Sequence, residues 1–168
     1  VGGHCIPLDP YYLAWKSKEY DLHTRFIELA GEINEGMPYY VMAKLQRLLN
    51  QRGRCLNGAD ILVLGVTYKA DVADWRETPA IKVMELLMRE GAALSYADPF
   101  TPSVTIGERS YKGVEVTATR LKESACALIL TAHSAFDYEQ IVRHAPLVFD
   151  TRNGTRHVKG DKNSVILL

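Results

Sequence analysis

Apolar residues recur at three- and four-residue steps over residues 24–49, which is the spacing of one face of a helix. Gly36 and Pro38 fall inside this pattern, so a kink is expected there. A shorter helix is predicted from Asp9-Pro10 to about Lys18, because the carboxylate can cap free backbone N–H groups and proline suits the first helical position. The long helix precedes any strand, so its apolar stripe must pack against another part of the protein or form a dimer interface.

After residue 58 the pattern changes to short apolar runs that alternate with helical segments. Strands are predicted at 61–66, 93–97, 126–130, 147–149 and 165–168, with a minor strand at 114–116. Helices are predicted at 78–91, 121–125 and 136–144. Such alternation is typical of a parallel sheet with helices on both faces. We therefore expect an α/β fold in which residues 1–57 are helical and residues 58–168 form a Rossmann-like, doubly wound parallel sheet.

Composition narrows the possible partners. The chain has 20 Lys+Arg and 20 Asp+Glu, so a broad basic face for nucleic acid is not expected. No apolar run approaches the roughly 20 residues that cross a bilayer, so no membrane partner is expected either. The 3 cysteines match no zinc spacing, which predicts no metal site, and they fit a reducing cytoplasm. The chain starts at Val1 without Met, so we expect a fragment of a longer protein.

Charged residues gather in a loop that would follow the first strand, at the sheet edge where open parallel sheets bind ligands. Loop 67–77 carries Lys69 and Arg76 just before a predicted helix, and cations beside free N–H groups suit a phosphate. Surface ion pairs of these two residues with Asp71 and Asp74 are the alternative.

Other strand ends carry further polar residues. Arg152 follows the strand at 147–149 and could hold an oxyanion with its guanidinium, or could lie in a surface turn. Asp98-Pro99 is interpreted as the end of a strand, and His133 as an ordinary loop histidine. Gly65 stands alone after the first strand, so the sequence has no Gly-x-Gly-x-x-Gly dinucleotide fingerprint.

The opening segment is dense in chemically distinctive residues. The pair Gly2-Gly3 allows the backbone to approach a ligand closely. Cys5 precedes a predicted helix N-terminus, where the helix dipole favours a thiolate, so it could be a nucleophile or a buried structural cysteine. Asp9 could orient or deprotonate a water, or could cap the helix.

These segments together resemble one known family. Residues 2–13, with the core His-Cys-Ile-Pro-Leu-Asp-Pro, resemble the catalytic-cysteine motif of the UDP-glucose/GDP-mannose dehydrogenase family. Residues 68–80 are similar to the family's second motif, an aromatic-Lys pair followed by Asp-x-Arg-x-(Ser/Thr)-Pro-Ala. Residues 96–99 and 149–152 fall in the family's order, so the resemblance covers essentially the whole chain. It implies a catalytic-cysteine loop and central dimerisation helix over 1–57, and a UDP-binding Rossmann-like domain over 58–168.

The resemblance also implies a reaction. The family oxidises the C6 alcohol of a nucleotide sugar to the carboxylate, and NAD is bound mainly by an N-terminal domain that this chain lacks. Cys5 is expected to form a thiohemiacetal and then a thioester with the sugar, and Asp9 to position the water that releases the acid.

The resemblance assigns binding roles to further side chains. Lys69 is expected at the diphosphate or sugar and Arg152 at the substrate nucleotide. Arg76 is expected near the NAD phosphates, and Asn34 on the long helix is expected to face the site. A homodimer through the long helix and a cytoplasmic location are also expected.

Two departures from the family pattern bear on the substrate. His4 stands where serine is usual before the cysteine, and Leu8 where UDP-glucose enzymes often have lysine. Both favour the branch that acts on UDP-N-acetylhexosamines for bacterial surface polysaccharides, with N-acetylglucosamine expected ahead of N-acetylmannosamine and glucose as a further alternative. Two readings without this reaction stay open, a non-catalytic nucleotide-binding module and an unrelated flavodoxin-like phosphate-binding domain.

Overall fold

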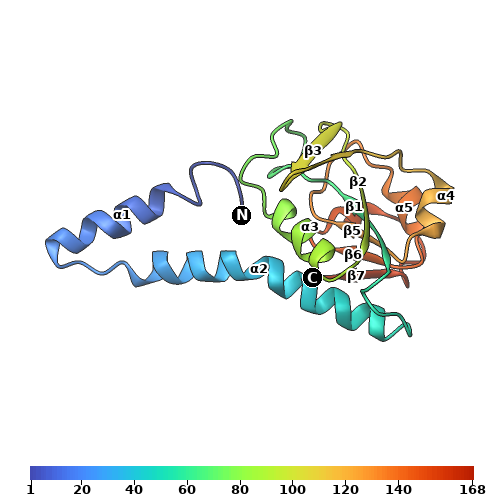
Figure 1. Cartoon of the computed structure of the whole chain (residues 1–168), viewed down its shortest axis with the longest axis horizontal. Coiled ribbons are helices and arrows are strands. Elements are labelled where there is room, and N and C mark those ends of the chain that lie inside the picture. The colour runs from blue at the N-terminus through green and yellow to red at the C-terminus, as the bar shows by residue number, and fades with distance from the viewer.

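Five parallel strands form the central sheet in the order β2-β1-β5-β6-β7. The computed structural model describes residues 1–168 and bounds the strands at Asp60–Leu64 (β1), Ala93–Ala97 (β2), Cys126–Ile129 (β5), Val148–Asp150 (β6) and Val165–Leu167 (β7). Each strand lies at a predicted apolar run. The sequence prediction of a Rossmann-like parallel sheet is therefore confirmed (Figure 1).

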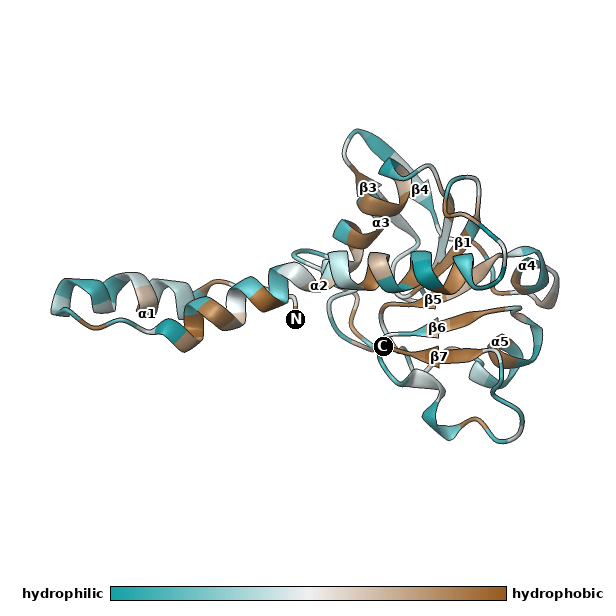
Figure 2. Cartoon of the chain, turned by 90° about the horizontal axis from the view of Figure 1, so that it is seen from below, coloured by the Kyte–Doolittle hydropathy of each residue, from teal (hydrophilic) through white to brown (hydrophobic).

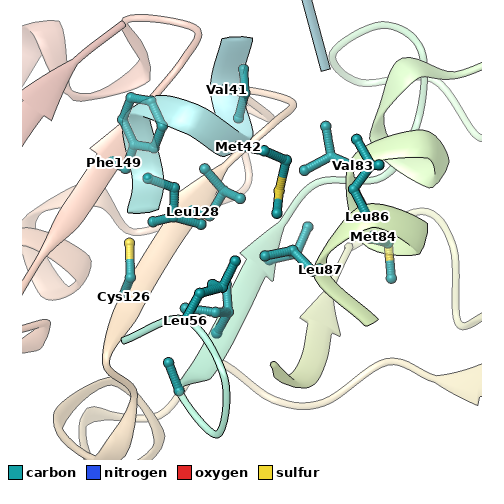
Figure 3. Packing of buried hydrophobic residues seen from close by; sticks show 14 of the residues in the cluster. Val41, Met42, Leu56, Val83, Met84, Leu86, Leu87, Cys126, Leu128 and Phe149 are labelled. Carbon is teal, nitrogen blue, oxygen red and sulfur yellow. The ribbon is translucent and has the colours of Figure 1, made fainter. Parts of the chain in front are cut away.

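Helices cover both faces of this sheet, as the doubly wound prediction requires. One face carries α2 (Arg25–Asn50) and α3 (Pro79–Arg89), and the other carries α4 (Ala118–Glu123) and α5 (Tyr138–His144). Strand side chains point alternately to the two faces. In β1, Ile61 and Val63 therefore join the core under α2 and α3, whereas Leu62 joins the core under α4 and α5. Figure 3 shows Met42 of α2 beside Val83 of α3 in the larger core.

The strand order creates a switch point in the middle of the sheet. The chain passes from β1 outward to β2 and then crosses to β5 on the other side of β1, so a crevice opens at the carboxyl ends of β1 and β5. Gly65 follows β1 with φ +79°, and a Cβ there would lie 2.3 Å from the carbonyl oxygen of Thr131. Only glycine allows this close approach, which holds the two sides of the crevice together.

A helical arm extends from the sheet domain (Figure 1). It contains α1 (Asp9–Ser17), the 3₁₀ helix η1 (Lys18–Tyr20) and the first half of α2. Helix α2 runs unbroken through Pro38. Beyond Pro38, Leu45 and Leu49 are fully buried, and burial of a leucine contributes about 1.5–3 kcal/mol. Before it, Phe26 is 88% exposed, so only half of the predicted apolar stripe is covered.

Two predicted elements need correction. A short antiparallel hairpin, β3 (Ser103–Ile106) and β4 (Arg109–Lys112), precedes the predicted strand at 114–116. That segment is not a strand, although the Val114 N–H donates to the Tyr96 carbonyl at the edge of β2. Helix α4 begins three residues before its predicted start, because the Thr117 hydroxyl accepts the Arg120 N–H and caps it.

The remaining features are a turn after β6, a buried cysteine in β5 and the character of the helices. A 3₁₀ turn, η2 (Gly154–His157), follows β6. Cys126 is fully buried in β5, as expected, and burial raises the pKa of its thiol to about 12. None of the helices combines the length and apolar character that crossing a membrane requires.

Candidate functional site

The opening glycine pair packs directly against the loop that follows β1. The Gly3 N–H donates to the Glu77 carbonyl at 3.1 Å. A Cβ on Gly2 would lie 2.5 Å from that carbonyl oxygen and 2.7 Å from Cδ of Pro79. Gly3 adopts φ +94°, and a Cβ on Gly3 would lie 3.1 Å from the ring of Tyr68. Two motifs far apart in sequence therefore form one surface, and glycine is needed at both positions for it.

Cys5 and Asp9 lie at the approach to α1. The carbonyl of Cys5 accepts the backbone N–H of Leu8 at 3.1 Å and of Asp9 at 2.8 Å, so the first turn begins before Asp9. Leu8 is consequently the N-cap, and no side chain caps the helix. The interpretation of Asp9 as a cap is wrong, and so is that of Cys5 as a buried structural cysteine, because its side chain is exposed. Both are accessible to a ligand.

A pocket of about 240 Å³ occupies the crevice between the β1 and β5 ends and α2. Tyr68, Thr131, Arg152 and Asn34 are among the residues that line it. The Asn34 side chain makes two hydrogen bonds to the backbone of Val1. Its Nδ2 donates to the Val1 carbonyl at 2.8 Å, and its Oδ1 accepts from the N-terminal amine. Asn34 therefore faces this pocket while fixing the start of the chain.

The loop that carries Arg152 is held by a buried carboxylate. Asp150 is 1% exposed, and it accepts the backbone N–H of Arg152 at 3.0 Å, of Gly154 at 3.2 Å and of Thr155 at 2.9 Å. The Thr155 hydroxyl donates to it as well, at 2.8 Å. Arg152 itself is exposed and also lines a second pocket of about 710 Å³ beside α5. Sequence reasoning missed Asp150 as the residue that fixes this turn.

The two cations of the β1 loop differ in their surroundings. Lys69 is exposed, and its ion pair with Asp71, one of the alternatives considered, does not form. Arg76 donates from Nε to Asp74 Oδ1 and from Nη2 to Oδ2, both at 2.9 Å, so the other alternative pair does form. These hydrogen bonds lower the pKa of Asp74 to about 2.

A buried imidazole, that of His133, lies between the loops that follow β1, β2 and β5. His133 is 0% exposed, and its Nε2 is 2.9 Å from Asp98 Oδ2, in a side chain that is also fully buried. Burial alone raises the pKa of Asp98, but hydrogen bonds from His133 and from the Val66 and Phe100 N–H groups outweigh it and lower that pKa. The interpretations of His133 as an ordinary loop residue and of Asp98 as a strand end alone are therefore wrong.

The helix that follows β1 does not offer a dinucleotide site. A Rossmann site places the pyrophosphate at the N-terminus of this helix. Here Thr78 caps α3 with its hydroxyl, and the Gly2-Gly3 backbone lies across the same end. That end of α3 is therefore occupied by the chain itself, and a contact of Arg76 with NAD stays a prediction. No group of three or more His, Cys, Asp or Glu side chains is arranged as metal ligands.

The fold and the site are those of a ligand-binding α/β domain. The chain holds an open, doubly wound α/β domain whose polar groups converge at the carboxyl edge of the sheet, the place where such domains bind ligands. Residues 62–157 match the UDP binding domain of the UDP-glucose/GDP-mannose dehydrogenase family, and residues 1–36 match its central domain. The chain belongs to this family.

Individual relatives are more distant. The UDP-N-acetyl-D-mannosamine dehydrogenase of Methanococcus maripaludis is 33% identical over 94% of this chain and 36% of its own length. The UDP-N-acetyl-D-glucosamine 6-dehydrogenase of Salmonella typhi is 29% identical over 81% of the chain and 32% of its own length. The structure of a UDP-D-ManNAc dehydrogenase from Pyrococcus horikoshii superposes with a TM-score of 0.77 at 26% identity, over 99% of this chain and 38% of that one. The chain thus spans about a third of the length of these relatives.

Proposed function

We propose that this chain forms the nucleotide-holding part, with the nucleophile, of an NAD-dependent UDP-sugar 6-dehydrogenase. One observation carries the proposal: the glycines of the Cys5 motif pack on the loop that carries Lys69, and Arg152 lines the adjoining crevice. The backbone of the Cys5 motif, the loop of Lys69 and the side chain of Arg152 thus meet at one edge of the sheet. Membership of the family and the names of its relatives support the same activity.

Each residue then has a defined task. Lys69 and Arg152 bind the diphosphate and nucleotide of the substrate, because charge-assisted hydrogen bonds suit phosphate oxygens. The Cys5 thiolate adds to the C6 aldehyde and keeps that intermediate bound as a thiohemiacetal. Asp9 positions the water that attacks the later thioester and releases the acid. NAD supplies the oxidising power, and Arg76 is proposed to bind its phosphates.

The proposed substrate class is the UDP-N-acetylhexosamines. His4 and Leu8, the two departures from the usual family motif, support this class. Relatives named for N-acetylmannosamine and for N-acetylglucosamine both match the chain, so an assay of the full-length enzyme with both epimers and with UDP-glucose decides between them. A cytoplasmic location and a role in surface-polysaccharide synthesis belong to the same proposal, as does a homodimer through the arm.

Binding of UDP tests the nucleotide-holding role. Calorimetry on this chain should detect UDP, and Lys69→Ala and Arg152→Ala should each weaken the affinity about 10-fold or more, since each removes a hydrogen bond from a charged group. Lys82→Ala is the matched control, because Lys82 is an exposed lysine on α3 that contacts only Glu85. A wild-type chain that does not bind millimolar UDP would contradict the proposed role.

The nucleophile is tested in the full-length enzyme. Cys5→Ser should abolish formation of the uronic acid, because a hydroxyl is not ionised at neutral pH and cannot replace the thiolate. Cys55→Ser serves as the control, since Cys55 is the other exposed cysteine. Acid formation at the wild-type rate in Cys5→Ser would exclude Cys5 as the nucleophile.

A further inference from the structure

The buried imidazole of His133 connects three loops that end at the crevice. The ring belongs to the loop after β5, and the loops after β1 and β2 supply the groups that bind it. Asp98 Oδ2 lies 2.9 Å from Nε2, and Thr67 Oγ1 lies 3.2 Å from the same nitrogen. The backbone N–H of Asp71 donates to Nδ1 at 3.0 Å. A fully buried ring with both nitrogens bonded cannot touch a substrate, so its role must be exerted through its partners.

The hydrogen bonds indicate which nitrogen of a neutral ring carries the proton. Because Asp71 donates to Nδ1, that nitrogen carries a lone pair, and the proton of a neutral imidazole lies on Nε2. This proton faces the Asp98 carboxylate. The Thr67 hydroxyl donates to the Lys69 carbonyl at 2.9 Å, which leaves its oxygen free to accept from Nε2. The ring is therefore an acceptor towards Asp71 and a donor towards Asp98.

The backbone on both sides of Lys69 depends on these contacts. Thr67 holds the Lys69 carbonyl. Asp71 adopts φ +60°, a conformation uncommon for residues other than glycine. It is kept there by its N–H bond to His133 and by its carboxylate, which accepts the Ser134 N–H at 2.8 Å. An unfavourable backbone conformation held from two sides is typical of a position where geometry serves function.

We propose that His133 is a positioning residue that fixes the loop of Lys69 so that its ammonium group meets the phosphates of the nucleotide. The inference rests on the proposed function, since Lys69 is the group that binds. Lys69 itself makes no side-chain hydrogen bond or ion pair, so the backbone contacts of its loop fix the point from which the side chain extends. The acceptor on Nδ1 is the contact that matters, because it holds the strained residue of the turn.

Two substitutions separate the two sides of the ring. The amide oxygen of His133→Asn can replace Nδ1 as the acceptor for the Asp71 N–H but does not reach Asp98. The longer side chain of His133→Gln can place its amide at the position of Nε2, donate to Asp98, and leave the Asp71 N–H without an acceptor. We expect His133→Asn to bind UDP within about threefold of the wild-type affinity and His133→Gln to weaken it about 10-fold.

A double-mutant cycle connects the effect to Lys69. In the Lys69→Ala background, His133→Gln should cause no further loss of UDP affinity, because the side chain that it positions is absent. Amide hydrogen exchange provides a second measurement without ligand. The Asp71 amide should be protected in the wild type and in His133→Asn and should exchange faster in His133→Gln.

The outcomes distinguish this inference from the function on which it rests. Equal losses of UDP affinity in the two variants, or a His133→Gln loss that persists undiminished without Lys69, would overturn the positioning role and indicate a structural histidine only. An Asp71 amide that stays protected in His133→Gln would overturn it too. If the wild type does not bind UDP, or if Lys69→Ala binds like the wild type, the proposed function fails and the positioning role fails with it, whatever the exchange data show.

Discussion

At the scale of single residues, the ion pair of Arg76 and Asp74 fixes the direction of the guanidinium and the charge of the carboxylate. The Arg76 side chain is 69% exposed, but two parallel hydrogen bonds to Asp74 fix the direction of its guanidinium. Arg76→Ala should raise the pKa of Asp74 from about 2 towards its usual value of 3.8. The rise should be partial, because the backbone N–H of residue 76 still donates to the carboxylate. NMR titration of the Asp74 carboxyl measures it.

The control for this titration is Arg156→Ala, since Arg156 contacts His157 and not Asp74. It should leave the pKa of Asp74 unchanged. An Asp74 pKa that stays near 2 in Arg76→Ala would mean that the guanidinium does not determine the charge of this carboxylate, and hence that the pair does not orient Arg76.

Residues of the candidate site differ in how far the sequence can indicate them. The spacing of Cys5 and Lys69 within motifs points to them, although their roles remain predictions. His133 and Asp98 are 35 positions apart and have no local signature. They meet only because β2 and β5 flank β1, an order that alternating helices and strands do not specify. Buried polar networks at a switch point thus depend on topology rather than on local pattern.

At the scale of elements, the close approach of the β1 and β5 ends gives a test of the crevice. Gly65→Ala should lower the free energy of unfolding by about 1–2 kcal/mol for the left-handed backbone. Overlap with the Thr131 carbonyl, 2.3 Å away, should add about 1–3 kcal/mol. Gly58→Ala is the matched control, with φ +76° and no atom within 4 Å of the added Cβ. Urea unfolding measures both losses, and equal losses would contradict a steric need for glycine beside the Thr131 carbonyl.

Most elements follow from periodicity, and the exceptions have physical causes. The β3–β4 hairpin was missed although Ser103–Ile106 alternates exposed and buried residues, because the run is only 4 residues long. The predicted strand at 114–116 lacks a partner strand and adds a single hydrogen bond to the edge of β2. Helix α1 begins at Asp9 as predicted, but its cap is Leu8 rather than Asp9, because the Cys5 carbonyl already accepts the N–H groups of Leu8 and Asp9. Boundaries therefore depend on individual hydrogen bonds that a hydrophobic pattern does not contain.

At the scale of the whole molecule, the arm is the part whose apolar side chains the rest of the chain leaves uncovered. Helix α2 has one continuous apolar stripe in sequence, but the sheet and α3 cover only its second half. Figure 2 shows hydrophobic stretches along the projecting half of α2. The following apolar side chains of the arm and its approach are half exposed or more: Ile6, Leu8, Tyr12, Leu13, Trp15, Tyr20, Leu22, Phe26, Leu29 and Ile33. Apolar patches of this extent are typical of protein interfaces.

If the arm forms the proposed homodimer, a charge in its apolar surface should separate the two copies. Phe26→Glu is the sharpest change, because this side chain is 88% exposed in the chain alone and contributes little to its fold. Light scattering should give twice 18.8 kDa for the wild type and 18.8 kDa for the variant. Val114→Glu, at an exposed apolar residue of the sheet domain, should stay dimeric. A wild-type chain that is monomeric at high concentration would exclude the arm as a sufficient dimer interface, because an apolar surface of this size buried between copies should hold them together in solution.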